Sequence, residues 1–532
     1  MKARNYIFVM PLLFGASLLQ AQNTFQNAEI SQDHDLQGTA RYVAMGGAFS
    51  ALGAEISAMG DNPAATALMR KSEVSITAGA LWGADETMTD MYSRTHATFD
   101  QGGLVGSFRI DGRYVKNFNI GFNYHKKINY NNLNGGEAYC SGSQLNQLAD
   151  LLNAYGADIP DADYVHGYHN LYTDCRDAGL IDMQGSRENP TWRRSGQLTP
   201  TWGQSMYRMT SGGLHAYDIN FSVNVKDRYY VGLNIGVEHM SYRNESSYAE
   251  RIGTDENPLD YYIEDLHTIR GTGVNFKLGA IIRPIEDNPL RLGVAIETPT
   301  WFLLTSRYDY WLYSKYIVDE ADAKRYGQPM HTFVAKPGVY TATAWNFYDM
   351  DYSLRTPWRF RLGIGSTVKN WFAWGADFEY AIFKYEGQGY PANDERRSVF
   401  NTIEDVDMNT NTRSCLSGQY RVKFGLEAKP IRQLALRLGY NYISSIYKNE
   451  EWDPGCADES TVNSIGTSWV TTSPTHLITM GLGTRIKWFG IDLAYKCRLQ
   501  HGYYFGTLDA YPAHVEMNQR RHTVVCTLSA RF

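Results

Sequence analysis

The feature that most constrains this chain is a long succession of segments in which apolar and polar residues alternate. Each segment, for example "FNIGFNY" (118–124), "YDINFSVNV" (217–225) or "LALRLGYNY" (434–442), places large apolar side chains on one face and polar residues or glycines on the other. The segments run over roughly 9–14 residues, whereas strands of soluble proteins average about 5–6. That length suits a tilted strand that crosses a bilayer. A soluble sandwich also alternates, but it does not need strands this long.

The connections between these segments are alternately short and long, which is typical of outer-membrane barrels with short periplasmic turns and long outer loops. The predicted short turns are 111–116, 226–228, 285–289, 368–370, 429–433 and 487–488. The predicted long loops are 83–102, 129–213, 244–269, 299–353, 386–417, 447–473 and 501–519.

The pattern predicts an all-β fold, a transmembrane antiparallel β-barrel of about 14 strands, because an even number returns both chain ends to the same side. The terminal aromatic residue Phe532 resembles the assembly signal of such barrels. The predicted strands are 72–82, 103–111, 117–128, 214–226, 229–243, 271–283, 290–298, 354–367, 371–385, 418–428, 434–446, 474–486, 489–500 and 521–532.

Composition agrees with this class. Aromatic residues make up 14% of the 532 residues, and mean hydropathy is −0.40. The mature part contains no apolar run long enough for a membrane-spanning helix. A net charge of −6 gives no reason to expect a nucleic-acid partner. The expected partners are outer-membrane lipid, lipopolysaccharide and the barrel assembly machinery.

The N-terminus has the form of a secretory signal. Lys2 and Arg4 precede the apolar stretch 7–19, and Ala21 is a suitable last residue before cleavage. An uncleaved membrane anchor is the alternative, which the shortness of the apolar stretch disfavours. We therefore expect a signal peptide at 1–21, a hatch or plug at 22–71, a barrel at 72–532, and a location in the bacterial outer membrane.

The stretch "GGAFSALGAEISAMGDNPAA" (46–65) is built mainly from small residues, beginning with Gly46 and Gly47. A barrel of this size has a lumen wide enough for water unless something fills it. Small residues suit a segment that passes close to the wall, as do glycines on the polar face of the strands. Asn62 can cap a short helix that starts at Pro63 and Ala64. We predict that this segment plugs the lumen.

The segment "ARYVAMGGAFSALGAEISAMGDNPAATAL" (40–68) resembles the N-terminal hatch of the FadL/TodX family of hydrophobic-compound transporters. The resemblance implies a hatch that stops leakage, with Asn62, Pro63 and Ala64 lying where it meets the wall. It also implies apolar substrates that are caught at outer loops and pass through a wall opening beside the hatch. The outer loops here, 129–213 above all, are longer than the family's, so ligand contacts are not carried over.

The segment "WFLLTSRYDYWLYSKY" (301–316) is the most aromatic part of the chain. Its residues could form an apolar capture groove, or they could extend a strand above the membrane and supply its aromatic girdle. Both interpretations are open. The candidate groove residues are Trp301, Phe302, Leu304, Tyr308 and Trp311. The segment 144–156 has a helical apolar face, which is interpreted as a loop helix that packs on the barrel rim, with a ligand-binding wall as the alternative.

Charged residues on two neighbouring predicted strands allow a register prediction. Arg359, Arg361, Asp377 and Glu379 all point inward if the flanking apolar residues face lipid. A three-residue turn at 368–370 would then pair Arg361 with Asp377 and Arg359 with Glu379 on the lumen wall.

No catalytic, cofactor-binding or metal-binding residues are predicted, so the chain is not expected to be an enzyme. The polar segment with His166, His169, Asp174, Cys175 and Asp177 matches no metal-ligand spacing. Four of the six cysteines lie in polar segments, and whether they form the pairs Cys140–Cys175 and Cys415–Cys456 is left open.

Three functions follow for comparison. The first is passive uptake of hydrophobic compounds such as long-chain fatty acids or aromatic hydrocarbons. The second is a barrel of the type IX secretion machinery, which would bind secreted proteins through its extracellular loops. The third, an outer-membrane lipid-modifying enzyme, would need a nucleophile and a histidine near the membrane rim, and the sequence shows no convincing pair.

Overall fold

The structure is a computed structural model of the full chain. It describes residues 24–85, 95–110, 112–138, 143–155, 174–175, 180–186, 189–194, 201–253, 258–286, 288–316, 334–336, 339–391, 402–449, 468–506 and 514–532. None of the described helices combines the length and the apolar character needed to span a membrane.

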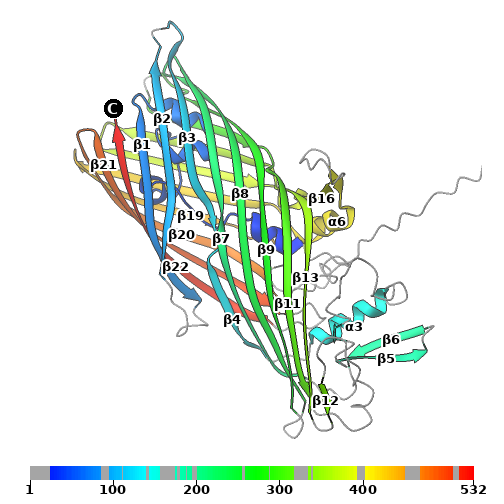
Figure 1. Ribbon diagram of the computed structural model, residues 1–532. Coiled ribbons are helices and arrows are strands. Elements are labelled where there is room, and N and C mark those ends of the chain that lie inside the picture. Colours follow the sequence, from blue (N-terminus) through cyan, green and yellow to red (C-terminus); the bar gives the residue numbers. More distant parts are fainter. Residues whose placement is uncertain are drawn as a thin grey trace, which may run out of the picture.

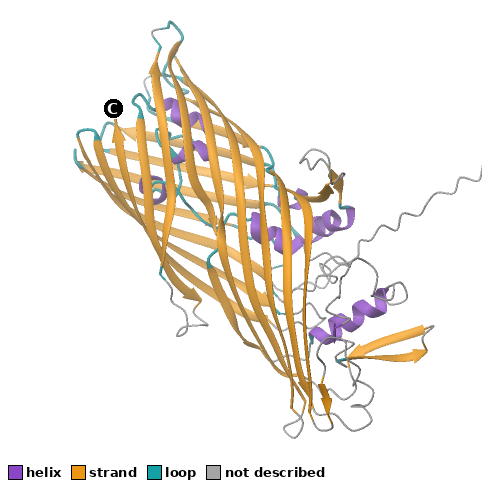
Figure 2. Cartoon of the chain, viewed as in Figure 1, coloured by secondary structure: helices purple, strands orange, loops and turns teal. Residues whose placement is uncertain are grey.

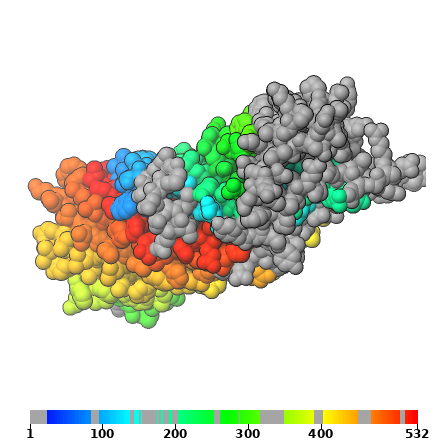
Figure 3. Space-filling model, turned by 90° about the horizontal axis from the view of Figure 1, so that it is seen from below, coloured from blue at the N-terminus to red at the C-terminus, as the bar shows by residue number. Residues whose placement is uncertain are grey.

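The described strands form a closed antiparallel barrel of fourteen strands, which confirms the predicted fold class. Closure is made by β1 (Glu73–Asp85), which pairs with β2 (His96–Arg109) on one side and with the last strand, β22 (His514–Arg531), on the other. In the space-filling view the red atoms of β22 lie beside the blue atoms of the first strands (Figure 3). The short turns and the C-terminus lie at one end of the barrel (Figure 1).

The remaining wall strands follow in sequence order, and four of them are interrupted and carry two labels each. The uninterrupted strands are β7 (Thr201–Val225), β8 (Tyr229–Gly253), β9 (Pro258–Ile282), β18 (Gln419–Ile431), β19 (Leu434–Ile443), β20 (Trp469–Ile486) and β21 (Phe489–Phe505). The interrupted ones are β3 (Val115–Asn129) with β4 (Asn132–Ala138), β10 (Arg291–Glu297) with β11 (Trp301–Tyr316), β14 (Arg359–Val368) with β13 (Val339–Arg355), and β15 (Phe372–Ala381) with β16 (Gly387–Pro391). Short additional strands are β5 (Ile181–Ser186), β6 (Asn189–Arg194), β12 (Val334–Lys336) and β17 (Thr402–Glu404).

Helical segments occur in two places. Inside the barrel are α1 (Thr24–Ser31), α2 (Ala40–Ala44) and the 3-10 turns η1 (Ser57–Gly60) and η2 (Pro63–Leu68) (Figure 2). Elsewhere are α3 (Gln144–Tyr155), α6 (Val406–Cys415) and η4 (Phe383–Tyr385). The predicted loop helix at 144–156 is therefore present as α3.

The wall has its apolar face outside and its polar face inside, which is the reverse of a soluble protein. Leu278 on the outer face is 53% exposed, whereas Asn234 on the inner face is completely buried. Outward apolar side chains recur on every second residue, as Leu104 and Phe122 show on adjacent strands. Such an outer band is the surface that a bilayer covers.

Several strands are much longer than predicted. The range 244–269 was expected as a loop, but its described residues, 244–253 and 258–269, continue β8 and β9, each of which has 25 residues. Their burial still alternates, with Tyr248 and Ile263 buried inside. The outward residues in this part include polar and charged ones such as Glu245. In this outer part of β8 and β9 the two faces therefore no longer differ clearly in polarity, although both strands continue.

Candidate functional site

The N-terminal segment runs through the lumen and is buried along almost its whole length from α1 to η2. It comes close to the wall where inward positions are glycine. An ideal Cβ on Gly232 would lie 2.3 Å from the carbonyl of Pro63, and one on Gly375 would lie 2.4 Å from the carbonyl oxygen of Ala48. The absence of side chains on the wall thus makes room for the plug backbone.

Gly46 and Gly47 form the tight turn that follows α2. Their φ angles are +63° and +76°, in the left-handed region that residues with a Cβ atom rarely adopt. A Cβ on Gly46 would also lie 2.9 Å from the carbonyl oxygens of Phe424 and Tyr440 on the wall. Glycine is therefore required here both by conformation and by contact.

Asn62 connects the plug to itself and to the wall. Its Oδ1 accepts a hydrogen bond of 3.0 Å from the amide of Ala64, which caps η2, and Pro63 takes the first position of that turn. Its Nδ2 donates to the carbonyl of Ser50 at 2.6 Å and to that of Ala280 on β9 at 3.3 Å. Asn62 is completely buried, so no water replaces these bonds.

We expect Asn62→Ala to loosen the plug locally. The lost cap costs about 1 kcal/mol, and leaving the buried Ser50 carbonyl unpaired costs about 1–3 kcal/mol more. Hydrogen exchange of the amides in 62–68 should become faster while the wall amides stay protected. Asn62→Asp is the comparison variant, because it keeps the cap acceptor but replaces the donor that faces the Ser50 and Ala280 carbonyls with an acceptor. Unchanged exchange in Asn62→Ala would contradict the assigned role.

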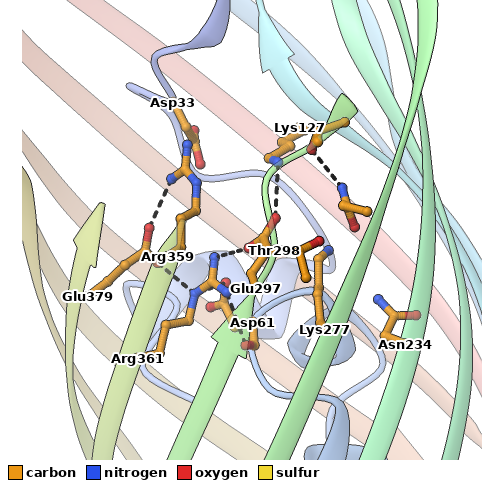
Figure 4. A network of polar contacts seen from close by, with 12 residues as sticks. Asp33, Asp61, Lys127, Asn234, Lys277, Glu297, Thr298, Arg359, Arg361 and Glu379 are labelled. Carbon is orange, nitrogen blue, oxygen red and sulfur yellow. Dashed lines mark hydrogen bonds and ion pairs between the residues drawn. The ribbon is translucent and has the colours of Figure 1, made fainter. Parts of the chain in front are cut away.

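Next to the plug turn η1, charged side chains from plug and wall form one buried network (Figure 4). Arg361 is its centre: its Nε lies 2.8 Å from Glu379, its Nη2 lies 2.7 Å from Glu297, and its Nε lies 3.7 Å from Asp61 of the plug. Lys423 on β18 contacts Asp61 at 2.6 Å. The plug is therefore held by ion pairs as well as by close packing.

The electrostatic balance favours ionised Asp61. Burial alone would raise the pKa of this carboxyl group, but Lys423 and then Arg361 outweigh burial and hold the pKa below its usual range. Asp61 also accepts a hydrogen bond of 2.5 Å from the hydroxyl of Tyr42 in α2. These contacts fix the middle of the plug against the wall.

The four charged residues predicted on the lumen wall do point inward and are buried, but their register differs from the prediction. Arg361 lies opposite Glu379, and Asp377 lies opposite Gly363. Arg359 pairs with Glu379 at 3.0 Å, whereas the predicted pair of Arg361 and Asp377 is not formed. The turn comprises residues 369–371 rather than 368–370, so the partner of each residue moves by two positions and the two faces of the strands stay the same.

Asp377 has another role instead. Its Oδ2 accepts a hydrogen bond of 2.9 Å from the amide of Ser50, so this wall carboxylate holds the plug backbone. The sequence offered no signal for this contact, because the two residues are 327 positions apart.

The wall is interrupted between β2 and β3. β1 and β2 stay paired as far as Leu81 and His96, with Asp100 left out of the register as a bulge. The pairing of β2 with β3 runs only from Arg109 to Gln101, which lies opposite His125. Beyond that point, the described part of β3 and the whole of β4 pair with β7 alone. Residues 96–100 of β2 are therefore not paired with residues 126–138 of β3 and β4, although β2 and β3 are neighbours in the wall.

Two cavities lie on either side of this break. One of about 100 Å³ is lined by Leu81, Trp82 and His96 from one edge and by Leu133 and Met209 from the other. One of about 60 Å³ lies beside the plug. The two cavities share the lining residues Asn132, Thr210, Gln519 and Arg521. The break thus lies between the outer surface and a cavity that plug residues line.

Aromatic rings mark the level of this break on the outer surface. The ring of His522 stacks on those of Trp82 and Tyr495, with centroids 5.9 Å apart in both pairs. Phe99 and Tyr124, on the two strands that separate, stack at 5.4 Å. Bands of this kind lie at the membrane–water interface of barrels.

The candidate groove residues belong to a single strand, β11, and lie on both of its faces. Phe302, Leu304 and Tyr308 point inward and are 1% exposed, and Phe302 and Leu304 pack in the apolar cluster around Ile30 of α1. Trp311 is 41% exposed on the outer face, and Trp301 shares that face by strand alternation. The five residues are therefore not brought together on one surface.

The other sequence features are placed as follows. Phe532 is 67% exposed, and its amide donates to the carbonyl of Ser72 at 3.1 Å. Cys175 and Cys415 are both buried free thiols, so neither the pair Cys140–Cys175 nor the pair Cys415–Cys456 is formed. Cys140, Cys456, the signal segment 1–21 and His166, His169 and Asp177 lie outside the described residues. The described residues contain no group of three or more metal-ligating side chains.

Comparisons with known proteins give structural likenesses only. No family model matches the chain, and no curated protein matches it. Among solved structures, it is similar to a Pseudomonas aeruginosa FadL homologue at 12% identity and a TM-score of 0.47, over 93% of this chain and 99% of that chain. It is also similar to the Ralstonia pickettii toluene transporter TbuX, at 12% identity and 0.46, over 93% and 98%. The Pseudomonas putida toluene transporter TodX matches at 13% and 0.45, over 94% and 99%.

Proposed function

We propose that this protein is an outer-membrane channel for the passive uptake of hydrophobic small molecules, related to the FadL/TodX family, with the N-terminal plug as its gate. The observation that carries the proposal is the interrupted ladder between β2 and β3, which lies beside the plug and within the outer aromatic band. Once the plug moves, a molecule dissolved in or near the membrane can reach the lumen there without crossing the rest of the wall.

The cavities beside the plug are too small for such a molecule at rest. Their volumes are about 60 and 40 Å³, whereas pockets that hold small ligands have volumes of roughly 300–1,000 Å³. Passage therefore requires movement of the plug. The channel should be closed to ions when no substrate is present.

Uptake by whole cells tests the role of the break. Ser211→Trp places a large ring in the lining of the outer cavity. Ser205→Trp is the matched control, because it lies on the same strand and face but outside that lining. In a deletion strain, we expect Ser211→Trp to reduce uptake of toluene and dodecanoate to the level of the empty vector, and Ser205→Trp to restore it. Equal uptake of both compounds with and without the native protein would reject the function.

The secretion-associated alternative uses the outer end of the molecule. β7, β8, β9 and β11 extend beyond the apolar band there, and α3 lies nearby (Figure 1). This surface could receive a protein. Co-purification of secreted-protein domains together with unchanged uptake in the deletion strain would favour that alternative.

A further inference from the structure

We propose that the outer surface of β3, β7, β8 and β9 binds the phosphate groups of lipid A, the phosphorylated glycolipid of the outer leaflet. These strands lie side by side in the wall (Figure 1). The residues that carry the proposal, called the outer basic patch below, are Lys126, His215, His239 and Arg270. The patch lies on the lipid-facing surface, so the proposal goes beyond uptake and does not depend on it.

The strand register places three of these residues in one row across the sheet. Lys126 on β3 lies opposite His215 on β7, and His215 lies opposite His239 on β8. Arg270 on β9 lies opposite Ser241, the next outward residue of β8, and is therefore a diagonal neighbour of His239. Because neighbouring strands lie about 4.8 Å apart, the row spans about 10 Å, which a single head group can cover.

The side chains of the row point away from the lumen. The chain neighbours of Lys126, which are His125 and Lys127, form ion pairs with buried carboxylates inside the lumen. By strand alternation Lys126 therefore points outward. The residues opposite it share that face, and all members of the patch are exposed or half-buried.

The patch begins where the outer apolar band ends. On β8 the outward residues of 229–237 are apolar or aromatic, and His239 is the next outward residue. Tyr124 and Tyr217, whose ring centroids lie 5.3 Å apart, form the aromatic level just before the row. The short turn 226–228 joins the other ends of β7 and β8, so the patch lies on the side of the long loops. A lipid whose acyl chains cover the band therefore brings its head group to the patch.

The outer surface of these strands carries no nearby counter-charge among the described residues. The next outward acidic side chain is Glu245, six residues beyond His239, and it already pairs with Arg243 at 2.7 Å. Asp100 at the bulge of β2 attracts Lys126, but it is completely buried. A phosphate group on the outer surface would supply the missing negative charge and accept charge-assisted hydrogen bonds.

Two members of the patch border a space that a phosphate oxygen can enter. A Cβ on Gly213 would lie 3.3 Å from Nε2 of His215 and 3.5 Å from Cδ of Lys126, so glycine leaves this space open. The hydroxyl of Tyr124 lies 2.8 Å from Nδ1 of His215 and orients the ring. When that hydroxyl donates to Nδ1, the neutral ring carries its proton on Nε2, which then donates into the space.

Native mass spectrometry of the full-length protein in detergent tests the patch. The probes are lipid A with two phosphates and the same lipid after both phosphates have been removed. We expect the phosphorylated lipid to bind about tenfold or more tightly than the dephosphorylated one. In the double variant Lys126→Gln/Arg270→Gln, its Kd should rise by about tenfold or more, because two charge-assisted contacts are lost. His215→Gln should raise Kd by a smaller factor.

His476→Gln is the matched control. His476 also follows the apolar band, after the exposed Ile478, and its Nδ1 atom lies 2.7 Å from the hydroxyl of Tyr440. The residues opposite it, Tyr442 and Leu499, are uncharged, so this variant should bind as the wild type does. The different mobility of folded and heated barrels on gels verifies that each variant is folded.

Two results would overturn the proposal, whatever the uptake experiment shows. One is equal affinity of the wild type for the two lipids. The other is an unchanged Kd for phosphorylated lipid A in the folded double variant.

Discussion

Replacing Gly232 with leucine is expected to unseat the plug and to open the barrel to ions. Even a Cβ at this position would lie 2.3 Å from the carbonyl group of Pro63 and 2.6 Å from the amide nitrogen of Ala64. These are backbone atoms at the start of η2, so no side chain can rotate away to relieve the clash. The wall can accept leucine once the plug has moved, because the lumen then offers space.

Planar-bilayer recordings measure this effect. The wild type should conduct poorly, and Gly232→Leu should raise steady conductance on the order of tenfold or more, toward the value of a barrel that lacks residues 24–69. Gly106→Leu is the control, since its Cβ would meet the flexible Phe108 ring at 3.2 Å and a backbone atom, the Ile120 carbonyl oxygen, only at an ordinary contact distance of 3.9 Å. A Gly232→Leu protein that is folded and still closed would show that close packing at this glycine does not hold the plug.

The second large effect is expected from Arg361→Met. Arg361 is 5% exposed and contacts Glu297 and Glu379 on the wall and Asp61 of the plug. Its removal leaves buried carboxylates with weaker partners, such as Lys127, which lies 3.6 Å from Glu297. Breaking a buried ion pair in this way costs about 3–5 kcal/mol. Urea unfolding of the protein in lipid vesicles measures the loss.

Two further variants separate charge from geometry. Arg361→Lys keeps the charge but loses the planar fork, so we expect an intermediate loss. Arg361→Met combined with Glu297→Gln removes one of the abandoned carboxylates and should recover part of the stability. If Arg361→Met stays within about 1 kcal/mol of the wild type, the network does not contribute as the distances suggest.

Much of the wall could be predicted from the sequence because its physical cause is local. A membrane strand must alternate apolar and polar residues, and residues such as Phe118, Ile120 and Phe122 show this without reference to the rest of the chain. The cap formed by Asn62 and Pro63 was equally local, and the structure places both at the start of η2. Beyond the membrane, the outer face of a strand meets water and needs no apolar residues. The alternation of apolar and polar residues therefore could not predict where strands such as β8 and β9 end.

The site depends on contacts that no local pattern records. The wall register follows from the turn at 369–371. A shift of each residue's partner by two positions leaves every face unchanged, so hydrophobicity could not distinguish the two pairings. The groove prediction treated 301–316 as one apolar surface, whereas strand geometry divides its residues between two faces.

The sequence by itself determined that this chain forms a membrane barrel with a thin segment to fill it, because alternation and small residues are properties of neighbouring positions. Only the tertiary structure decided where the wall is interrupted and which charges meet behind the break. Asp35 and Lys496 are 461 positions apart, and Arg498 and Arg521 face one cavity only because β21 and β22 close the barrel beside the plug. Closure of the barrel brings residues together that are far apart in the sequence. The strand pairing that closes the barrel depends on all strands of the sheet and not on any local pattern.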